Sequence, residues 1–567
     1  MWIRCTTAII VTGAIQGFAY PELAIPPGDV PLSQFSADDQ LLFPERQFQT
    51  EPGGLDPGLL DLSSPGPAPN PVLDPAAEPT IEVDTILVEG STVFSLEVLA
   101  QVVQPFEGRT LTLEELRKAA NAVTQLYLNA GYITSEAVLP PQDSQAGVVK
   151  LQVIEGRIDE IRVEGTDRLA TYVQRRVALG SSTPVNQTTL ENQLQLLKTD
   201  PLFANIEASL RQGQTPGGST LIVRVTEAAP LTGSLALDTL SPRSVGEFRT
   251  GASLEYRNLA GLGDQLRAAA YRSTTGGSYA YELSYQVPLN ARDGTLLLRA
   301  SPSNFRITDS TDPTFGLGLS GTTDSYELQY RQPLIRTLRE ELALSAGFRY
   351  RNGSTLVGGL ITPPTVTSVF NLGQDYLRRD PSGLWAVQSQ FRLGTGFLDA
   401  TVAPASLPDG QFFSWLGQVQ RLQRLGPNHQ LLIQGGVQLT PDRLLGSEQF
   451  FVGGAQSVRG YYQNERFGDN GLRFSLEDRI TLQRDEGGRP MLQINPFFDL
   501  GYVWASDSTF QATRQNLLAG TGLGVEVNPF ENFNARLDLG VPLITLNELA
   551  SDRPSGLRVY FDIRYRF

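Results

Sequence analysis

The chain has 567 residues, a net charge of −15, one cysteine and one histidine. This length predicts several domains, and the negative charge argues against nucleic acid as a partner. No stretch beyond the N-terminus has the ~18 uninterrupted apolar residues of a transmembrane helix, which excludes a helical membrane protein.

Residues 1–19 have the pattern of a secretory signal peptide. Arg4 is followed by mostly small and apolar residues that end in Gly17-Phe18-Ala19, a small-x-small cleavage site. We therefore expect cleavage after Ala19; the alternative is a cytosolic N-terminal helix. The only cysteine, Cys5, lies inside this signal, so the mature chain should contain no disulfide, cysteine metal ligand or cysteine nucleophile.

Residues 20–79 are predicted to form a proline-rich linker. Segments such as residues 51–58 and 64–71 consist largely of proline, glycine and small polar residues, a composition that cannot hold helix or sheet. Only residues 32–42 show some helical character. We therefore expect no strand before residue 80.

An internal repeat follows the linker. Residues 80–155 and 156–228 both show the order strand, helix, helix, strand, strand, and the opening strand ends in Val-Glu-Gly in both. Thr112, with Glu115 three residues later, predicts a capping box at the start of a long helix. Each unit should therefore be a small α/β domain. The expected elements are a strand ending at 90, helices at 96–103 and 112–127 and strands at 132–139 and 148–154, then a strand at 161–165, helices at 169–177 and 190–197 and strands at 204–210 and 220–225.

The pattern changes again after Glu227. Helical periodicity disappears, and two-residue alternations separated by turn clusters continue to the C-terminus, which is typical of antiparallel β structure. We place about sixteen strands in residues 229–567, an even number as in bacterial single-chain barrels, so both barrel ends should lie on one side of the membrane. The strands should start near residues 232, 247, 264, 278, 295, 322, 340, 385, 411, 429, 446, 471, 493, 517, 533 and 557.

The last strand indicates that this barrel crosses a membrane. In residues 557–567 the odd-numbered residues are apolar or aromatic, whereas the even-numbered ones include three arginines and an aspartate. Transmembrane barrel strands place apolar residues toward lipid and polar ones toward a wet lumen. The predicted fold class is therefore mainly β, an antiparallel outer-membrane barrel preceded by two periplasmic α/β domains. Asp478 disagrees, because the same alternation turns it toward lipid, which predicts a bulge or a register error.

A loop and a strand together form a candidate functional site. We expect an extracellular loop between the strands that start near 446 and 471. The next strand, which starts near 493, contains residues 495–501. The loop tip consists of Val458, Arg459, Gly460 and Tyr461. In the strand, alternation places three residues on the lumen face: Phe497, Asp499 and Gly501.

Two interpretations of these residues remain open. An arginine on a loop long enough to fold inward, together with a carboxylate in the wall, predicts a charge-assisted latch between Arg459 and Asp499. Gly501 would leave room for the incoming segment. Taken separately, the loop tip indicates only a turn, and the carboxylate indicates only a solvated lumen.

This arrangement resembles the two-partner secretion transporters (the TpsB family). Two POTRA domains before a sixteen-stranded barrel, the Val-Arg-Gly-Tyr loop tip and the Phe497-x-Asp-x-Gly501 strand carry the resemblance, which covers residues 80–567. It implies an outer-membrane pore, with its N-terminal domains in the periplasm, that exports one large secreted β-helical protein of the TpsA type. It also implies that the loop folds into the barrel, that Arg459 meets Asp499, and that the barrel assembly machinery reads the terminal Phe567.

The N-terminus differs from that family pattern. Members can carry an N-terminal helix that plugs the pore, whereas residues 20–79 are rich in proline and contain no long amphipathic helix. The sequence therefore gives no support for a plug helix.

Other classes of function compete with secretion. An insertase of the same superfamily would share the arginine loop, but insertases usually carry more POTRA units. A passive porin would not need two periplasmic domains. A barrel lipase or protease would need a catalytic histidine or an acidic cluster, and the only histidine, His429, lies in a Gly-Pro-Asn-His turn. We therefore expect no enzymatic activity, no cofactor and no metal, with outer-membrane lipid as a further partner.

Overall fold

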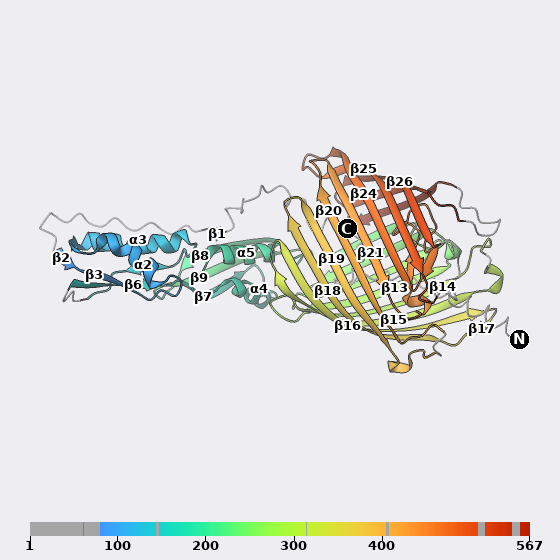
Figure 1. The fold of residues 1–567 in the computed structure, drawn as a ribbon, viewed down its shortest axis with the longest axis horizontal. Helices are drawn as coiled ribbons and strands as arrows, with labels where there is room; N and C mark the ends of the chain where they lie inside the picture. The colour runs from blue at the N-terminus through green and yellow to red at the C-terminus, as the bar shows by residue number, and fades with distance from the viewer. Residues whose placement is uncertain are drawn as a thin grey trace. The chain divides into compact units, whose positions relative to one another are not determined.

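The chain divides into two compact units, one within Gly54–Ala229 and one within Pro230–Phe567 (Figure 1). The predicted signal peptide and its cysteine lie outside the described residues. Among the described residues, no helix is long and apolar enough to cross a membrane. The computed structural model describes residues 60–61, 80–142, 147–312, 314–403, 407–507, 516–546 and 556–567.

The first part of Gly54–Ala229 is a small α/β fold. In its main sheet, of order β3-β6-β5, the central strand runs parallel to β3 and antiparallel to β5. The predicted order of strands and helices is present, and β2 and β4 pair as a further sheet that the sequence did not predict. The elements are β2 (Thr80–Val83), β3 (Thr85–Glu89), α2 (Leu96–Val103), η4 (Gln104–Phe106), β4 (Arg109–Thr112), α3 (Leu113–Asn129), β5 (Glu136–Val138) and β6 (Val148–Ile154).

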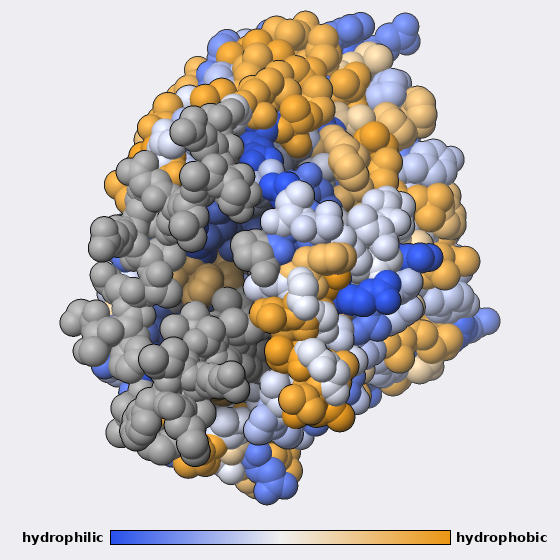
Figure 2. Space-filling model, turned by 90° about the vertical axis from the view of Figure 1, so that its right-hand side faces the viewer, coloured by the Kyte–Doolittle hydropathy of each residue, from blue (hydrophilic) through white to orange (hydrophobic). Residues whose placement is uncertain are grey.

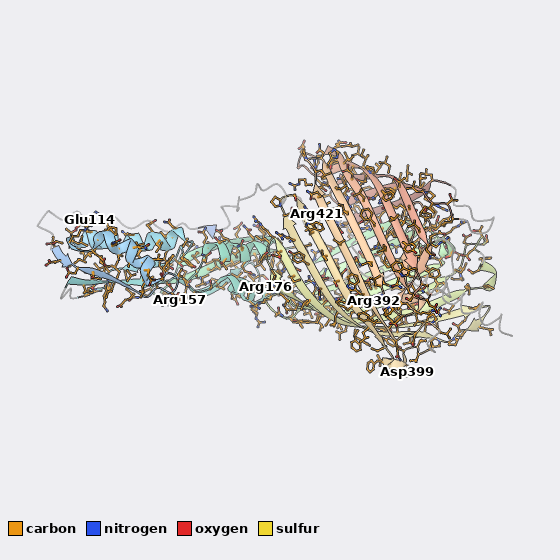
Figure 3. The ribbon with its side chains drawn as sticks, viewed as in Figure 1. Glu114, Arg157, Arg176, Arg392, Asp399 and Arg421 are labelled. Atoms are coloured by element: carbon orange, nitrogen blue, oxygen red, sulfur yellow. The ribbon has the colours of Figure 1, made fainter. Side chains whose placement is uncertain are left out.

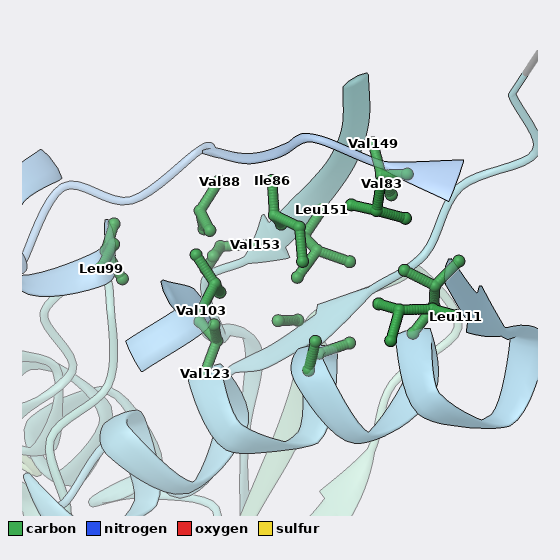
Figure 4. Close-up of a cluster of buried hydrophobic side chains, with 14 of the residues drawn as sticks. Val83, Ile86, Val88, Leu99, Val103, Leu111, Val123, Val149, Leu151 and Val153 are labelled. Carbon is green, nitrogen blue, oxygen red and sulfur yellow. The ribbon is translucent and has the colours of Figure 1, made fainter. Parts of the chain in front are cut away.

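An apolar core joins the helices of this domain to its sheet. α3 begins at the predicted capping box, in which the Thr112 hydroxyl accepts from the Glu115 backbone N–H and the Glu115 carboxylate accepts from the Thr112 backbone N–H. Val123 of α3 and Leu151 of β6 are fully buried in this core (Figure 4). Burial in the same core raises the pKa of Tyr127 to about 12.

The second part of this unit repeats the fold. Gly90 and Gly165, which end the two Val-Glu-Gly motifs, both have positive φ, and a Cβ on either would overlap a backbone oxygen of the neighbouring parallel strand. The motif recurs because both opening strands end in the same close approach. The elements are β7 (Arg157–Glu164), α4 (Ala170–Val177), η6 (Ala178–Gly180), α5 (Gln187–Lys198), β8 (Phe203–Gln212) and β9 (Gly218–Glu227).

A strand from the linker extends the second sheet. β1 (Leu60–Asp61) runs parallel to β8, with Leu60 opposite Ala208 and Asp61 opposite Ser209, and the sheet order is β1-β8-β9-β7. The expectation that the linker contains no strand is therefore wrong. The free edge of β8 has unpaired backbone groups, and the few residues between two proline-glycine segments suffice to pair with them.

The described part of Pro230–Phe567 forms a closed antiparallel barrel. It contains sixteen long strands and the short β17, and β10 pairs with β28 to close the ring. Its strands are β10 (Leu231–Asp238), β11 (Arg249–Arg257), β12 (Gln265–Ser273), β13 (Ser278–Pro288), β14 (Thr295–Arg306), β15 (Ser320–Arg336), β16 (Glu340–Val357), β17 (Leu360–Ile361), β18 (Thr365–Asp380), β19 (Gly383–Thr395), β20 (Phe412–Arg424), β21 (His429–Leu439), β24 (Asn470–Arg484), β25 (Pro490–Trp504), β26 (Leu517–Phe530), β27 (Phe533–Pro542) and β28 (Arg558–Arg566). Short 3₁₀ helices in its loops are η7 (Arg243–Val245), η8 (Phe315–Leu317), η9 (Phe397–Asp399) and η10 (Gly446–Glu448).

The predicted number of strands is right, but two of the assignments behind it are wrong. The strand expected near residue 446 is β22 (Phe450–Val452), which pairs with β23 (Arg466–Gly468) as a hairpin within the loop between β21 and β24. The strand missed by the sequence is β18. Residues 366–369 at its start are all buried, so the alternation that identifies a half-buried strand is absent there. One false strand and one missed strand cancel.

Side chains of the barrel strands alternate between an apolar outer face and a polar inner face. In β28, Val559 is exposed on the outer face, whereas the neighbouring Tyr560 is buried on the inner face. Figure 2, a view onto the end of the barrel, shows hydrophobic residues gathered around the outside and hydrophilic ones further in. The faces predicted for the last strand are therefore confirmed.

Asp478 does lie on the outer face, but neither a bulge nor a register error accounts for it. The β24–β25 pairing keeps its register from Glu477 to Ile480 and becomes irregular only after Thr481. Asp478 Oδ2 lies 3.5 Å from Nδ1 of His429, the first residue of β21. A polar partner near the end of the neighbouring strand therefore accommodates this acid.

Candidate functional site

The loop between β21 and β24, residues 440–469, folds into the barrel. Its tip is buried, since Val458 and Tyr461 are 0% exposed and Arg459 is 5% exposed. Val458 and Tyr461 belong to an apolar cluster that includes Val503 of β25. The tip is therefore seated against the inner wall of the barrel.

The tip arginine is held by a carboxylate of that wall. Arg459 Nε and Nη2 donate to the two Asp499 oxygens at 2.7 and 2.9 Å, and its backbone N–H donates to Asp499 Oδ2 at 3.0 Å. This bidentate, charge-assisted geometry requires the planar guanidinium of arginine. The guanidinium carbon also lies 3.4 Å from the ring centroid of Phe497, where a cation is attracted to the aromatic face. Among the described residues, no other cation lies within salt-bridge distance of Asp499.

Two further acids of the wall contact the same arginine. Arg459 Nη1 lies 2.8 Å from Glu477 Oε2 and 3.5 Å from Asp538 Oδ2. Glu477 also binds Arg479 and Arg536, and Arg536 binds Asp538. The loop arginine therefore completes a buried network in which three arginines meet three carboxylates. Removing one partner from such a network leaves an uncompensated buried charge, which strongly destabilises the contact between the loop tip and the wall.

Small residues make the room that the tip occupies. A Cβ on Gly501 of β25 would lie 2.7 Å from Val458 Cγ2, and a Cβ on Gly520 of β26 would overlap the backbone oxygen of Arg459. Gly460 has φ +105°, a conformation that residues with a Cβ rarely adopt. The close approach of the tip therefore depends on glycines in the wall and in the loop itself.

Two tyrosines complete the seat. The Tyr461 hydroxyl lies 2.9 Å from the backbone oxygen of Ala519 and 2.8 Å from that of Ile544. The Tyr560 hydroxyl accepts from the Gly460 backbone N–H at 2.8 Å and donates to the Tyr461 backbone oxygen at 2.6 Å. The last strand of the barrel therefore also contacts the loop tip.

Comparison with known families shows what kind of barrel this is. A family model described as "Haemolysin secretion/activation protein ShlB/FhaC/HecB" matches residues 217–527, more than half of the chain. The chain belongs to this family. A model of the ShlB-type POTRA domain also matches residues 81–156, so the first periplasmic domain is a POTRA domain.

Individual members of the family are similar over most of the chain. The outer membrane transporter CdiB of Escherichia coli is 25% identical over 478 residues, which cover 81% of this chain and 77% of CdiB. The hemolysin transporter protein ShlB of Serratia marcescens is 25% identical over 413 residues, which cover 70% and 72%. The solved structure of CdiB from Escherichia coli has the same fold, with a TM-score of 0.67 at 23% identity over 88% of this chain and 93% of that one.

Membership of the haemolysin secretion/activation family fixes the compartment and the kind of function. The chain is an outer-membrane transporter of the two-partner secretion type, and its POTRA region lies in the periplasm. The start of β10 and the end of β28 therefore lie on the periplasmic side, because β10 follows the POTRA region and β28 pairs antiparallel to β10.

The C-terminal residue of this transporter takes part in closing the barrel. Phe567 exchanges backbone hydrogen bonds with Gly233 of β10, at 3.0 Å from the Phe567 nitrogen and 2.9 Å to its oxygen. Its ring is 57% exposed on the outer face and stacks with Tyr565. That the assembly machinery reads this residue stays a prediction.

Sequence reasoning found the loop tip and Asp499 but missed the rest of the network. Glu477, Asp538 and Tyr560 all occupy inner-face positions of strands that alternate clearly, so the alternation was the signal that could have found them. Which of the many inner-face charges meet depends on the register between strands, and a single strand's pattern does not contain it. The functional role of the seven predicted site residues in the loop and strand stays a prediction.

The site is built to hold a segment in place. The described residues contain no group of three or more histidine, cysteine, aspartate or glutamate side chains arranged to bind a metal ion. His429 lies with Asp478 on the outer face, whereas the Arg459 network lies on the inner face. The contacts that the site offers to the loop are ion pairs, hydrogen bonds, a cation–π contact and apolar packing.

Proposed function

We propose that this transporter exports one large secreted β-helical protein of the TpsA type, and that residues 440–469 act as a latch in its pore. The observation that carries the proposal is the buried Arg459–Asp499 ion pair. It joins a loop inside the barrel to the barrel wall, and it can open without breaking any strand pairing. The loop occupies space that an exported chain needs, so transport requires the loop to move. The residues proposed to shape its seat are Val458, Gly460, Tyr461, Phe497 and Gly501.

We also propose a separate role for each part of the chain. Residues 1–19 direct export, residues 20–79 link the parts, residues 80–155 and 156–228 are two POTRA domains, and residues 229–567 form the pore. The POTRA domains capture the exported chain by adding one of its strands to a sheet edge. The sheet orders support this role, because β5 and β7 are edge strands.

Transport by this mechanism needs no reaction catalysed by the chain itself. The outer membrane offers no nucleotide, so progressive folding of the exported protein outside the cell would supply the free energy. A net charge of −15 disfavours nucleic acid, and no cofactor is proposed. The remaining proposed partners are outer-membrane lipid and the barrel assembly machinery, which would read Phe567. Removing Phe567 should therefore slow assembly of the barrel, measured by pulse-chase.

Substitutions at the ion pair test the latch. Arg459→Ala should abolish or strongly reduce secretion while the barrel still assembles and remains heat-modifiable on gels. Asp499→Ala should do the same, and the double variant should be no worse than either single one because the two residues act as a unit. Arg459→Lys should also be impaired, because lysine lacks the planar fork. Fully additive losses would contradict the latch.

A deletion tests the role of the periplasmic domains. Without residues 80–228 the barrel should fold and conduct ions but secrete nothing, and normal secretion would reject substrate capture by the POTRA domains. The insertase alternative predicts another outcome. In that case the levels of many outer-membrane proteins would fall, whereas secretion of a single substrate would not be the main loss.

A further inference from the structure

The inward-folded loop contains another buried charge that contacts the wall, of opposite sign to its tip arginine. Glu448, in η10, is 2% exposed. Its carboxylate lies 3.2 Å from Arg392 Nη1 and 3.6 Å from Arg351 Nη1, and it accepts from the Thr367 hydroxyl at 3.3 Å. The wall residues of this contact come from β19, β16 and β18.

Main-chain contacts fix the same segment. Arg351 Nη1 donates to the Ser447 backbone oxygen at 2.7 Å, and Gln438 Nε2 donates to the Glu448 backbone oxygen at 3.0 Å. Arg392, labelled on the barrel in Figure 3, also donates to the side chain of Gln438 at 2.9 Å. Wall side chains therefore hold both the carboxylate and the backbone of this segment.

The two charged contacts of the loop lie on different arcs of the wall. The Glu448 carboxylate contacts β16, β18 and β19, whereas the Arg459 guanidinium contacts acids of β24, β25 and β27. The two sets have no wall strand in common, and β20 and β21 lie between them in the barrel order. The loop is thus fastened at two separate places along its length, by a carboxylate among arginines and by an arginine among carboxylates.

We propose that Glu448 is a second anchor of the loop, a positioning residue that holds residues 447–448 against β16, β18 and β19 independently of the Arg459 pair. This inference rests on the proposed latch function. Breaking the Arg459 pair alone then leaves the loop held at Glu448. Full withdrawal of the loop from the pore requires both the Arg459 and the Glu448 contacts to break. The competing role for Glu448 is only to neutralise Arg351 and Arg392 in the wall.

Cysteine labelling reports whether the segment near Glu448 and the loop tip stay buried, and it does not depend on secretion. The only natural cysteine is Cys5, inside the predicted signal peptide, so single reporters at Leu444→Cys and Val458→Cys should react alone. Both positions are buried (1% and 0% exposed), and a membrane-impermeant maleimide should react slowly with them. Heat-modifiability on gels confirms that each variant is folded.

Glu448→Gln should raise the labelling rate at the Leu444→Cys reporter about tenfold or more, because charge-assisted hydrogen bonds are lost, and should leave the Val458→Cys reporter near its starting rate. Arg459→Ala should do the reverse, and the combined variant should expose both. The matched control is Asp485→Asn, which removes a carboxylate that pairs with Arg489 in the turn between β24 and β25, and it should change neither rate. A Leu444→Cys rate within about twofold of wild type in Glu448→Gln would overturn the anchor without touching the Arg459 latch.

A double variant separates anchoring from charge neutralisation. Glu448→Gln combined with Arg392→Gln removes one charge of each sign and leaves Arg351 on the Ser447 backbone oxygen. If Glu448 anchors the loop, the Leu444→Cys reporter stays fast in the double variant. If Glu448 only neutralises the wall, labelling returns to the slow rate and the proposal fails. Secretion should fall in Glu448→Gln, and unchanged secretion with fast labelling would reject a role of this anchor in transport.

Discussion

The periplasmic unit and the barrel bury different kinds of side chain. In Gly54–Ala229 the fully buried side chains, such as Leu151 and Leu194, form two apolar cores between helices and sheets. In the barrel interior the buried side chains include Glu477, Arg479 and Asp499, at 4%, 3% and 0% exposed. The periplasmic unit therefore buries mainly apolar side chains, whereas the barrel interior buries charged side chains beside apolar clusters such as that of Val458 and Val503.

This difference follows from how each region is held together. A small α/β domain in water depends on apolar burial for most of its stability. A membrane barrel satisfies its backbone within a closed ring of strands and turns its apolar face to lipid, so its interior is free to be polar. The interior of the barrel can therefore hold contacts that open and close, such as the Arg459 network, while the wall stays folded.

The largest expected effect comes from the apolar core of the first POTRA domain. Leu151→Ala removes a fully buried side chain of β6, which should cost about 2–5 kcal/mol. Leu113→Ala is the matched control, because Leu113 is 41% exposed at the start of α3, and should stay within about 0.5 kcal/mol. Hydrogen exchange of α3 amides in the full chain measures both. Equal protection in the two variants would mean that the core does not carry the domain's stability.

The two faces of β28 give the next effect. Phe561→Arg would put a charge on the outer face, where Phe561 stacks with Phe248 at 5.7 Å between ring centroids, at a cost of about 2–4 kcal/mol near the midplane. Arg564→Phe changes an inner-face residue that pairs with Asp562, and should leave assembly largely intact. The amount of heat-modifiable barrel reports both. Normal assembly of Phe561→Arg with loss of Arg564→Phe would invert the face assignment of this strand.

The sequence predicted those features that depend on local periodicity. The two-residue alternation gave the faces of the last strand and of Asp499, and the spacing of Thr112 and Glu115 gave the capping box of α3. These features depend on side chains a few residues apart, which follow directly from helix and strand geometry.

The sequence failed where a neighbour outside the local segment decides the outcome. The segment expected as a barrel strand near residue 446 pairs with β23 inside the loop, and β1 pairs with the edge of β8. Asp478 was judged misplaced because its partner, His429, lies on another strand. The acids that surround Arg459 were missed for the same reason. Pairing between distant segments is set by register and topology, which periodicity does not contain.

Gly520 in the barrel wall tests whether the polar interior is packed as tightly as an apolar core. A Cβ on Gly520 would overlap the backbone oxygen of Arg459, whereas on Gly353 of β16 the nearest atom would be 3.5 Å away. Gly520→Ala should therefore displace the loop tip at a cost of about 1–3 kcal/mol, and Gly353→Ala should be tolerated. Reactivity of the Val458→Cys reporter measures the displacement. A slow reaction in Gly520→Ala would contradict this expectation, because it would show that the barrel interior accommodates the added methyl group without moving the loop tip.

The smallest expected effect tests whether a polar contact contributes to the stability of the first POTRA domain, whose core is apolar. Thr112→Ala removes the side-chain acceptor for the Glu115 backbone N–H, which should cost about 1 kcal/mol. Ser95→Ala is the matched control, because Ser95 precedes α2 but makes no side-chain capping bond to its backbone. Exchange of the Glu115 amide should therefore speed up in Thr112→Ala, while exchange in the first turn of α2 should change less in Ser95→Ala. Unchanged exchange at Glu115 would mean that the apolar core alone holds α3. The division between a periplasmic unit stabilised by apolar burial and a barrel interior built from polar contacts would then be sharper than the capping box suggests.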